Sequence, residues 1–359
     1  MANTAPTNPF FYGGRIVDPP RFVGRTQEIR FIIQRMSGAQ MTSVGVVGPP
    51  RIGKSSLLYH LYQTYPERVQ ASQWFLVSYV SLQDARVRNL AGFLQTVGNA
   101  LATARRWHPK GSLLPAWPTP CRDLPTFRQG LQTMAEAGLR CVLCLDEFEA
   151  LLDAPTEFDD HFFDALRAAM DDQVLMLIIA SARPLSFYGS RVRSVSRFFN
   201  LGNTRYLEEL SENEARELVR LPIDVGGSVP ALGVGDQALA LRLGGRHPYL
   251  LQMAAYTVFE AQVSGQDETW VRTQFEREAA GYRGVRVRVR QWLAHSLWTT
   301  PAAVGRLAGW LGARQDEARN WAVGMVIVLL VILAITGALP VREFLRWLMA
   351  VLGLGGGQP

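Results

Sequence analysis

Residues 43–56 decide the fold and read SVGVVGPPRIGKSS. The apolar residues 43–47 predict a short buried strand. The loop from Gly48 to Ser55 matches G-x-x-x-x-G-K-[ST], and a helical sequence begins at Lys54. The two glycines let the backbone curl so that its N–H groups converge on phosphate oxygens, and the helix N-terminus adds partial positive charge. The stretch therefore predicts a strand, a phosphate-binding loop and a helix.

Two side chains of this loop have specific tasks. Lys54 places a compact positive charge near the β- and γ-phosphates, in a chain whose basic residues are otherwise almost all arginine. Ser55 offers its hydroxyl to Mg²⁺. Backbone groups along the whole loop would hold the phosphates. We therefore expect the nucleotide to be bound by Gly48, Pro49, Pro50, Arg51, Ile52, Gly53, Lys54, Ser55 and Ser56.

An acidic pair, Asp146-Glu147, ends the apolar segment 140–145. Asp146 is suited to the Mg²⁺ shell beside the phosphate loop. Glu147 would orient and polarise the attacking water as a general base. The alternative is an ordinary acidic turn at the end of a strand. The separation from the loop leaves room for another strand at 74–81.

The remaining apolar segments predict a parallel sheet. Strands are expected at 43–47, 74–81, 140–145, 174–180 and 205–210. Helices are expected between them, at 26–36 with Thr26 as the cap, and at 54–65, 89–106, 126–138 and 158–171. Continuous apolar strands that alternate with helices indicate a three-layer α/β sandwich, with a central parallel sheet covered on both faces. Ser211 and Glu214 have the spacing of a capping box and would open a helical region.

The core resembles the additional-strand, catalytic-glutamate class of P-loop ATPases, in which another strand lies between the strands that carry the phosphate loop and the acidic pair. That class has a polar residue after the fourth strand that senses the γ-phosphate. Ser181 matches this position, and Arg183 is a candidate for contact with phosphate or a neighbouring subunit. An ordinary turn before Pro184 is the alternative. Candidates for an arginine finger are Arg191, Arg193 and Arg197.

More narrowly, the chain resembles the STAND branch of the AAA+ ATPases, close to the archaeal-type and origin-recognition-like ATPases. The resemblance covers about residues 8–260. The segments that carry it are Asn8–Phe10, Phe22–Arg25 (FVGR), GPPRIGKSS (48–56), LCLDEFEAL (143–151), SARP (181–184), LEELSENEA (207–215) and GRHPYLLQ (245–252). It implies ATP and Mg²⁺ as ligands, slow hydrolysis and a nucleotide-gated change between closed and open states.

The same resemblance implies adenine or sugar contacts from Val23, Arg25, His247 and Pro248. His247 could equally be a packed lid histidine. Family members often continue into a winged helix and a long array of repeats, and here residues 264–319 are short and rich in arginine. The expected domains are an arm (1–21), an ATPase core (22–210), a helical lid (211–263), a linker or reduced winged helix (264–319), a transmembrane helix (320–341) and an amphipathic tail (342–359).

Composition sets the broad class. The chain has 359 residues, with 48% hydrophobic and 19% charged, which excludes a disordered or collagen-like protein. A net charge of +6 permits contact with nucleic acid or anionic lipid but implies neither. Cys141 and Cys144 lie in an apolar segment and point to opposite faces of a strand, so we interpret them as buried thiols.

Residues 320–341 carry no charge, and a helix of this length would span the hydrocarbon core of a bilayer. The alternative is a buried core helix of a soluble domain. No signal peptide precedes the core, so we expect a single-pass membrane protein with its ATPase in the cytoplasm. After the span, one apolar face of 342–359 is suited to the membrane surface, and a disordered tail is the alternative.

These patterns favour a membrane-anchored ATPase that works as a nucleotide-dependent switch in signalling or defence. Its expected partners are ATP, the bilayer, a second copy of the chain and an unidentified protein. A nucleic-acid ATPase is the second hypothesis, because 283–290 is basic and the resemblance includes origin-recognition proteins. We favour nucleic acid less. A passive anchor that binds ATP without turnover is the third.

Overall fold

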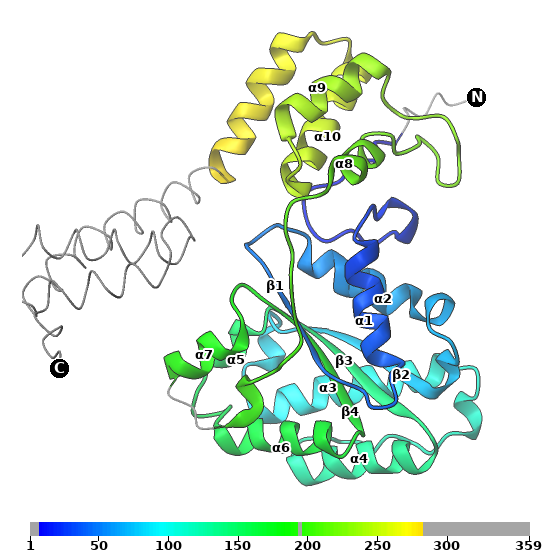
Figure 1. The fold of residues 1–359 in the computed structure, drawn as a ribbon, viewed down its shortest axis with the longest axis vertical. Helices are drawn as coiled ribbons and strands as arrows, with labels where there is room; N and C mark the ends of the chain where they lie inside the picture. Colours follow the sequence, from blue (N-terminus) through cyan, green and yellow to red (C-terminus); the bar gives the residue numbers. More distant parts are fainter. Residues whose placement is uncertain (1–6, 193–195, 283–359) are drawn as a thin grey trace, which may run out of the picture. The chain divides into compact units, whose positions relative to one another are not determined.

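The computed structural model describes residues 7–192 and 196–282 (Figure 1). The chain divides into one unit up to Phe275 and a second from Glu276 onward. The first unit holds the phosphate loop, the acidic pair and the helical region that we expect to be a lid, for which we keep the name lid, so its fold is the one that positions the predicted site residues.

A five-stranded parallel sheet forms the centre of the first unit, with the order β2-β3-β4-β1-β5. The strands are β1 (Val44–Val47), β2 (Phe75–Ser81), β3 (Arg140–Asp146), β4 (Leu175–Ser181) and β5 (Thr204–Tyr206). The predicted parallel sheet is confirmed. β1 leads into the phosphate loop and β3 ends in the acidic pair, and the strand that lies between them in the sheet is β4. The segment expected as a strand at 74–81 is β2, at the edge of the sheet.

The fifth strand differs from its prediction over 205–210. It ends at Tyr206, although Leu207 N still donates to Val47 O at 2.7 Å. The sequence then turns toward the lid, where Leu210 N donates to Arg246 O at 2.9 Å. The backbone of Leu210 pairs with the lid and not with the sheet. The prediction from apolar residues therefore placed the end of the fifth strand too late, at residue 210 and not at Tyr206.

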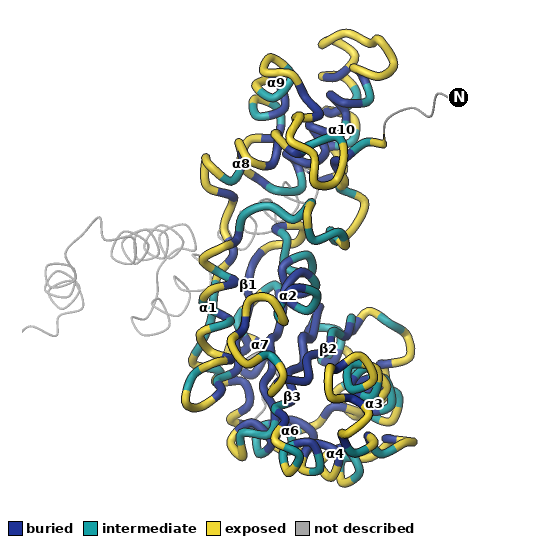
Figure 2. The backbone as a smooth tube through the Cα atoms, turned by 90° about the vertical axis from the view of Figure 1, so that its right-hand side faces the viewer, coloured by how far each residue is buried: buried dark blue, intermediate teal, exposed yellow. Residues whose placement is uncertain are grey.

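Helices cover both faces of the sheet, and strands β1 to β4 are buried along most of their length, whereas the edge strand β5 is not (Figure 2). One face packs against α1 (Thr26–Met36) and α2 (Lys54–Arg68). The other packs against helices that include α3 (Leu90–Trp107), α4 (Leu124–Glu136) and α6 (Asp160–Asp171). Short helices α5 (Glu149–Leu152) and α7 (Leu185–Val192) follow β3 and β4. The expected three-layer sandwich is therefore present.

The two thiols of the C-x-x-C lie on opposite faces of β3. Cys141 packs into the cluster beneath α3, α4 and α6, and Cys144 into the cluster beneath α1 and α2. Both are fully buried and free. Burial raises the pKa of Cys141 to about 12, which keeps it an inert thiol. The interpretation as buried core cysteines is confirmed.

Helix starts follow two different rules. Asn89 and Asp123 cap α3 and α4 with their side chains, accepting from Gly92 N and Thr126 N. By contrast, Thr26 is not the cap of α1. Arg25 holds that position in a left-handed conformation with φ 61°, and no side chain caps the helix. The reason is that the backbone N–H of Arg25 is bound by a carboxylate of the lid.

The helical lid comprises α8 (Glu212–Leu218), α9 (Val234–Gly244) and α10 (Pro248–Ser264), and residues 268–282 are also helical. The predicted capping box is confirmed: Ser211 Oγ accepts from Glu214 N, and the Glu214 carboxylate accepts from Ser211 N. Within the residues described, no helix is long and apolar enough to cross a bilayer. The expected span 320–341, the tail 342–359 and most of the segment 264–319 lie outside those residues.

Candidate functional site

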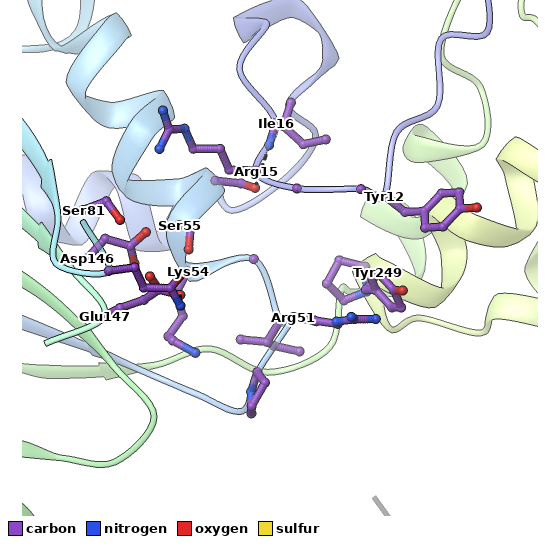
Figure 3. Close-up of a pocket in the computed structure, with 18 of the residues that line it drawn as sticks. Tyr12, Arg15, Ile16, Arg51, Lys54, Ser55, Ser81, Asp146, Glu147 and Tyr249 are labelled. Atoms are coloured by element: carbon purple, nitrogen blue, oxygen red, sulfur yellow. Dashed lines mark hydrogen bonds between the residues drawn. The ribbon is translucent and has the colours of Figure 1, made fainter. Parts of the chain in front are cut away.

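A cavity of about 1190 Å³ opens at the carboxyl ends of β2, β3 and β4 (Figure 3). The N-terminal arm, the phosphate loop, the acidic pair and the start of α10 all line it. The predicted site residues in the lining are Val23, Arg25, Pro50, Arg51, Ile52, Gly53, Lys54, Ser55, Ser56, Asp146, Glu147 and Pro248. Those outside it are Gly48, Pro49, Ser181, Arg183 and His247. The fold thus brings most of the predicted residues to one place.

The phosphate loop curls as the glycine pattern requires. Gly53 has φ +100°, a conformation that side chains rarely adopt. A Cβ at Gly48 would lie 2.9 Å from Ile52 Cγ2 and 3.2 Å from Leu207 O, so only glycine fits there. Lys54 Nζ donates to the carbonyls of Gly48 at 2.8 Å and Pro49 at 3.0 Å. The ammonium is therefore held across the loop where a phosphate would lie.

The electrostatics of Lys54 are set by opposing effects. Burial lowers the pKa of its ammonium, and the carboxylates of Glu149, Asp146 and Glu147 act in the opposite direction. All three carboxylates line the same cavity. A lysine placed between loop carbonyls and carboxylates is positioned to hold an anion.

On the metal side of the cavity, Asp146 is buried at 2% exposure. Its Oδ2 accepts a hydrogen bond of 2.7 Å from Tyr79 Oη, while its buried Oδ1 has no hydrogen-bond partner among the described residues. Ser55 lines the cavity nearby (Figure 3). No described group of three or more His, Cys, Asp or Glu side chains could hold a metal by itself. One carboxylate and one hydroxyl fit Mg²⁺, which takes few protein ligands and completes its shell with phosphates and water.

Glu147 has a strained backbone, with φ 61°. Gln83, after β2, donates from Nε2 to Glu147 Oε1 at 2.6 Å. Burial raises the pKa of Glu147, and the charges of Asp146 and Glu149 add to this effect. Strain of this kind is retained where the surroundings fix a side chain for a task. Sequence reasoning missed Gln83, because nothing in its local pattern shows that β2 ends beside β3.

A further carboxylate, Glu149, was also missed. It lines the cavity and accepts hydrogen bonds from Ala182 N and from Tyr188 Oη, the latter at 2.9 Å. It therefore joins the acidic end of β3 to the end of β4. The only sequence signal was its place just after the acidic pair, in LCLDEFEAL.

The predicted sensor residues close a turn at the end of β4. Ser181 is buried, and its Oγ donates to Arg183 O at 2.7 Å. This contact is the one expected of a strand-ending turn, and the γ-phosphate roles of Ser181 and Arg183 stay predictions. Among the arginine-finger candidates, Arg197 is exposed on a short 3-10 turn. Arg193 and the side chain of Arg191 lie outside the described residues.

In the FVGR segment, Arg25 is 4% exposed. Its Nη2 donates to Ile52 O at 3.0 Å in the phosphate loop and to Glu208 O at 2.7 Å before the lid. Its backbone N donates to Glu214 Oε1 at 2.6 Å. Arg25 thus links the loop to the first lid helix, and a direct contact with adenine or sugar stays a prediction.

From the lid, Pro248, Tyr249 and Gln252 line the cavity. The guanidinium of Arg51 lies 4.2 Å from the ring centroid of Tyr249, which joins the phosphate loop to α10. His247 is buried and precedes the first residue of α10, outside the lining. This position fits the packed-histidine alternative. Tyr249 and Gln252 were not predicted, although they lie in the GRHPYLLQ segment.

The N-terminal arm connects the lid to the loop helix, a feature that the sequence did not reveal. Asn8 Nδ2 donates to Glu260 Oε1 at 2.9 Å, and Phe11 N donates to Gln252 Oε1 at 3.1 Å, both on α10. Further along, Ile16 N donates to Ser56 Oγ at 3.0 Å. The Ser56 hydroxyl is therefore engaged by the arm. The arm forms one wall of the cavity (Figure 3).

Comparison with known proteins fits this geometry. The family model described as Novel STAND NTPase 1 matches residues 15–269. The chain is similar to the solved Walker-type ATPase PABY2304 of Pyrococcus abyssi, at 12% identity and a TM-score of 0.59, over 86% of this chain and 90% of that one. It is also similar to the ORC2 protein of Aeropyrum pernix in ADPNP-ADP complexes, at 16% identity and a TM-score of 0.54, over 76% and 72%. These identities show the fold alone. No curated protein matches the chain in sequence.

Proposed function

Because the chain belongs to the Novel STAND NTPase 1 family and is an ATPase, we propose that it is a membrane-anchored, nucleotide-dependent switch in signalling or defence. The observation that carries the proposal is the single cavity in which the phosphate loop and the acidic pair meet the lid residues Pro248, Tyr249 and Gln252. A ligand there would contact core and lid at once. Binding or hydrolysis of this ligand would therefore change the contacts between core and lid.

The ligand we propose is ATP with Mg²⁺. Lys54 and the loop N–H groups would hold the phosphates, and Ser55 and Asp146 would hold the cation. Mg²⁺ supplies charge neutralisation on the phosphate oxygens. The ORC2 protein of Aeropyrum pernix is solved with ADPNP and ADP, which supports an adenine nucleotide. Calorimetric titration with ATP and GTP, each with and without Mg²⁺, tests this. Equal affinity for GTP, or no binding of either, would contradict it.

For turnover, Glu147 would act as the general base that accepts a proton from the attacking water. Its carboxylate lines the cavity with Lys54 and is oriented by Gln83. We retain Ser181 and Arg183 as proposed γ-phosphate sensors. Under that role, Ser181→Ala would slow hydrolysis and leave ADP affinity unchanged. Weakening of ADP binding to the same degree would instead indicate that Ser181 only closes the turn at the end of β4.

The membrane part of the proposal rests on the uncharged segment 320–341. The ATPase would face the cytoplasm, where ATP is, and ATP-driven closure would favour self-association of the chains in the bilayer. The test is the size of the detergent-purified full chain with ADP and with a non-hydrolysable ATP analogue. We expect larger particles with the analogue. The same size in both states would contradict the association step.

Nucleic-acid binding is the rival proposal, supported by the net charge of +6 and the alternating arginines of 283–290. Neutralised phosphates would make such binding fall steeply with salt. The diagnostic variant replaces Arg286, Arg288 and Arg290 with alanine. Salt-sensitive DNA binding that this variant loses would favour the rival. Binding that the variant retains would show that this segment is not the contact.

A further inference from the structure

Asp146 is held by a side chain that the proposed function does not use. Tyr79, on β2, donates its hydroxyl to Asp146 Oδ2 at 2.7 Å. The second oxygen, Oδ1, is buried and has no hydrogen-bond partner among the described residues. One oxygen of the carboxylate is therefore fixed, and the other remains for a cation or a water in its shell.

Tyr79 is itself held by the N-terminal arm. Arg15 Nη1 donates to Tyr79 Oη at 3.3 Å. The guanidinium carbon lies 4.9 Å from the ring centroid of Tyr79 and 4.3 Å from that of Tyr59. Burial raises the pKa of Tyr79, and the charge of Asp146 adds to this, so the hydroxyl stays protonated and remains a donor. The contacts form one chain from Arg15 through Tyr79 to Asp146.

We propose that Tyr79 is a positioning residue for the magnesium site: it orients Asp146 toward the cation, and Arg15 holds Tyr79 in place. The proposal rests on the ATP and Mg²⁺ site described under the proposed function. Carboxylates that bind metals are themselves held by hydrogen bonds, and loss of such a bond lowers metal affinity by about 10- to 100-fold. The arm would thus contribute to the metal site without supplying a ligand.

A structural role alone predicts a different result. Tyr79 packs in an aromatic cluster with Tyr59 and Tyr62, and a half-buried phenol needs a hydrogen-bond partner in any case. If Tyr79 only packs, removal of its hydroxyl changes thermal stability and not the response to magnesium. Tyr62 offers a matched control: its ring lies 6.4 Å from that of Tyr79, and Tyr62→Phe leaves the bond to Asp146 intact.

The experiment uses Tyr79→Phe in the full chain, which keeps the ring and its contacts with Tyr59 and Tyr62. ADP affinity is measured over a series of Mg²⁺ concentrations and in EDTA. We expect the Mg²⁺ concentration for half-maximal tightening to rise about 10-fold or more, with ADP affinity in EDTA unchanged and Tyr62→Phe like the wild type. An unchanged magnesium response, or equal weakening with and without magnesium, would overturn the proposal.

Arg15→Met tests the contribution of the arm. We expect a smaller shift in the same direction, and no additional shift when it is combined with Tyr79→Phe, because Arg15 acts through the Tyr79 hydroxyl. Full additivity of the two shifts would overturn this part. A wild-type chain that binds ADP equally well with and without Mg²⁺ would instead contradict the proposed function. The two failures are therefore distinguishable.

Discussion

The two walls of the cavity are built in different ways. The core wall consists of the phosphate loop and the acidic pair, which follow directly from buried parallel strands of the sheet. The opposite wall consists of the arm and the start of α10, joined to the core by contacts of individual side chains such as Ser56 with Ile16, Arg15 with Tyr79 and Arg51 with Tyr249. Rigid sheet ends are suited to chemistry that needs fixed geometry. A wall joined to the core through individual side chains is suited to respond to the ligand.

The comparison predicts that changes in the core wall abolish activity and that changes in the opposite wall reduce it. The largest effect is expected for Glu147→Gln. Loss of the general base should slow ATP hydrolysis by roughly 10²- to 10⁴-fold, with nucleotide affinity retained. Phosphate release and calorimetric binding measure the two quantities. Glu67→Gln, exposed on α2 and outside the cavity, is the control and should hydrolyse normally. Turnover at the wild-type rate in Glu147→Gln would exclude its role as base.

Lys54→Ala is expected to have the next largest effect. Removal of the charge held over the loop should weaken nucleotide binding on the order of 100-fold. Lys110 is a matched control, because it is exposed and lies 5.2 Å from the ring of Trp74, outside the cavity. Lys110→Ala should bind nucleotide like the wild type. Unchanged affinity in Lys54→Ala would contradict the assignment of the loop.

A smaller effect is expected at the link between the walls. Arg25→Met removes a buried guanidinium and leaves the carbonyls of Ile52 and Glu208 without this donor. We expect a loss of about 2 kcal/mol in the free energy of unfolding, from unsatisfied buried groups. Urea unfolding measures it, with Arg30→Met on the exposed side of α1 as control. Equal stability of both variants would show that the link does not hold core and lid together.

The smallest effect is expected in the opposite wall, at Tyr249. Tyr249→Ala removes the ring that faces Arg51 and should weaken ATP binding by about 1 kcal/mol, the typical contribution of a cation–π pair. Tyr249→Phe keeps the ring face and should restore affinity. If Tyr249→Ala weakened nucleotide binding as much as Lys54→Ala does, the two walls would not differ as we describe.

The core wall was predictable from sequence because its signals are local. The loop pattern, the acidic pair and the strands that carry them are each contiguous, and the structure brings them together. Gln83, Tyr79 and Glu149 were not predicted because their importance arises from strand order. The sequence did not show that β2 is the neighbour of β3.

The contacts of the N-terminal arm were the part of the site that the sequence predicted least. The arm's described residues, 7–21, form no long helix or strand, so periodicity gave no information about the path of the arm. Its contacts join residues far apart in the chain, such as Asn8 and Glu260. Two local errors have a similar origin. Thr26 has the chemistry of a cap, but contacts with Glu214 fix the backbone before it. The fifth strand ends early because the lid takes over its backbone pairing.

The Glu214 carboxylate has a consequence for where the molecule can bend. Glu214 Oε2 accepts a hydrogen bond from Ser211 N at the start of α8, and Glu214 Oε1 accepts one from Arg25 N. A Cβ at Gly24 would lie 2.7 Å from it, so the fit is close. A hinge that separates the lid from the core would therefore have to break this bond to Arg25 or leave α8 attached to the core. Truncations that aim to isolate the core should accordingly end after that helix.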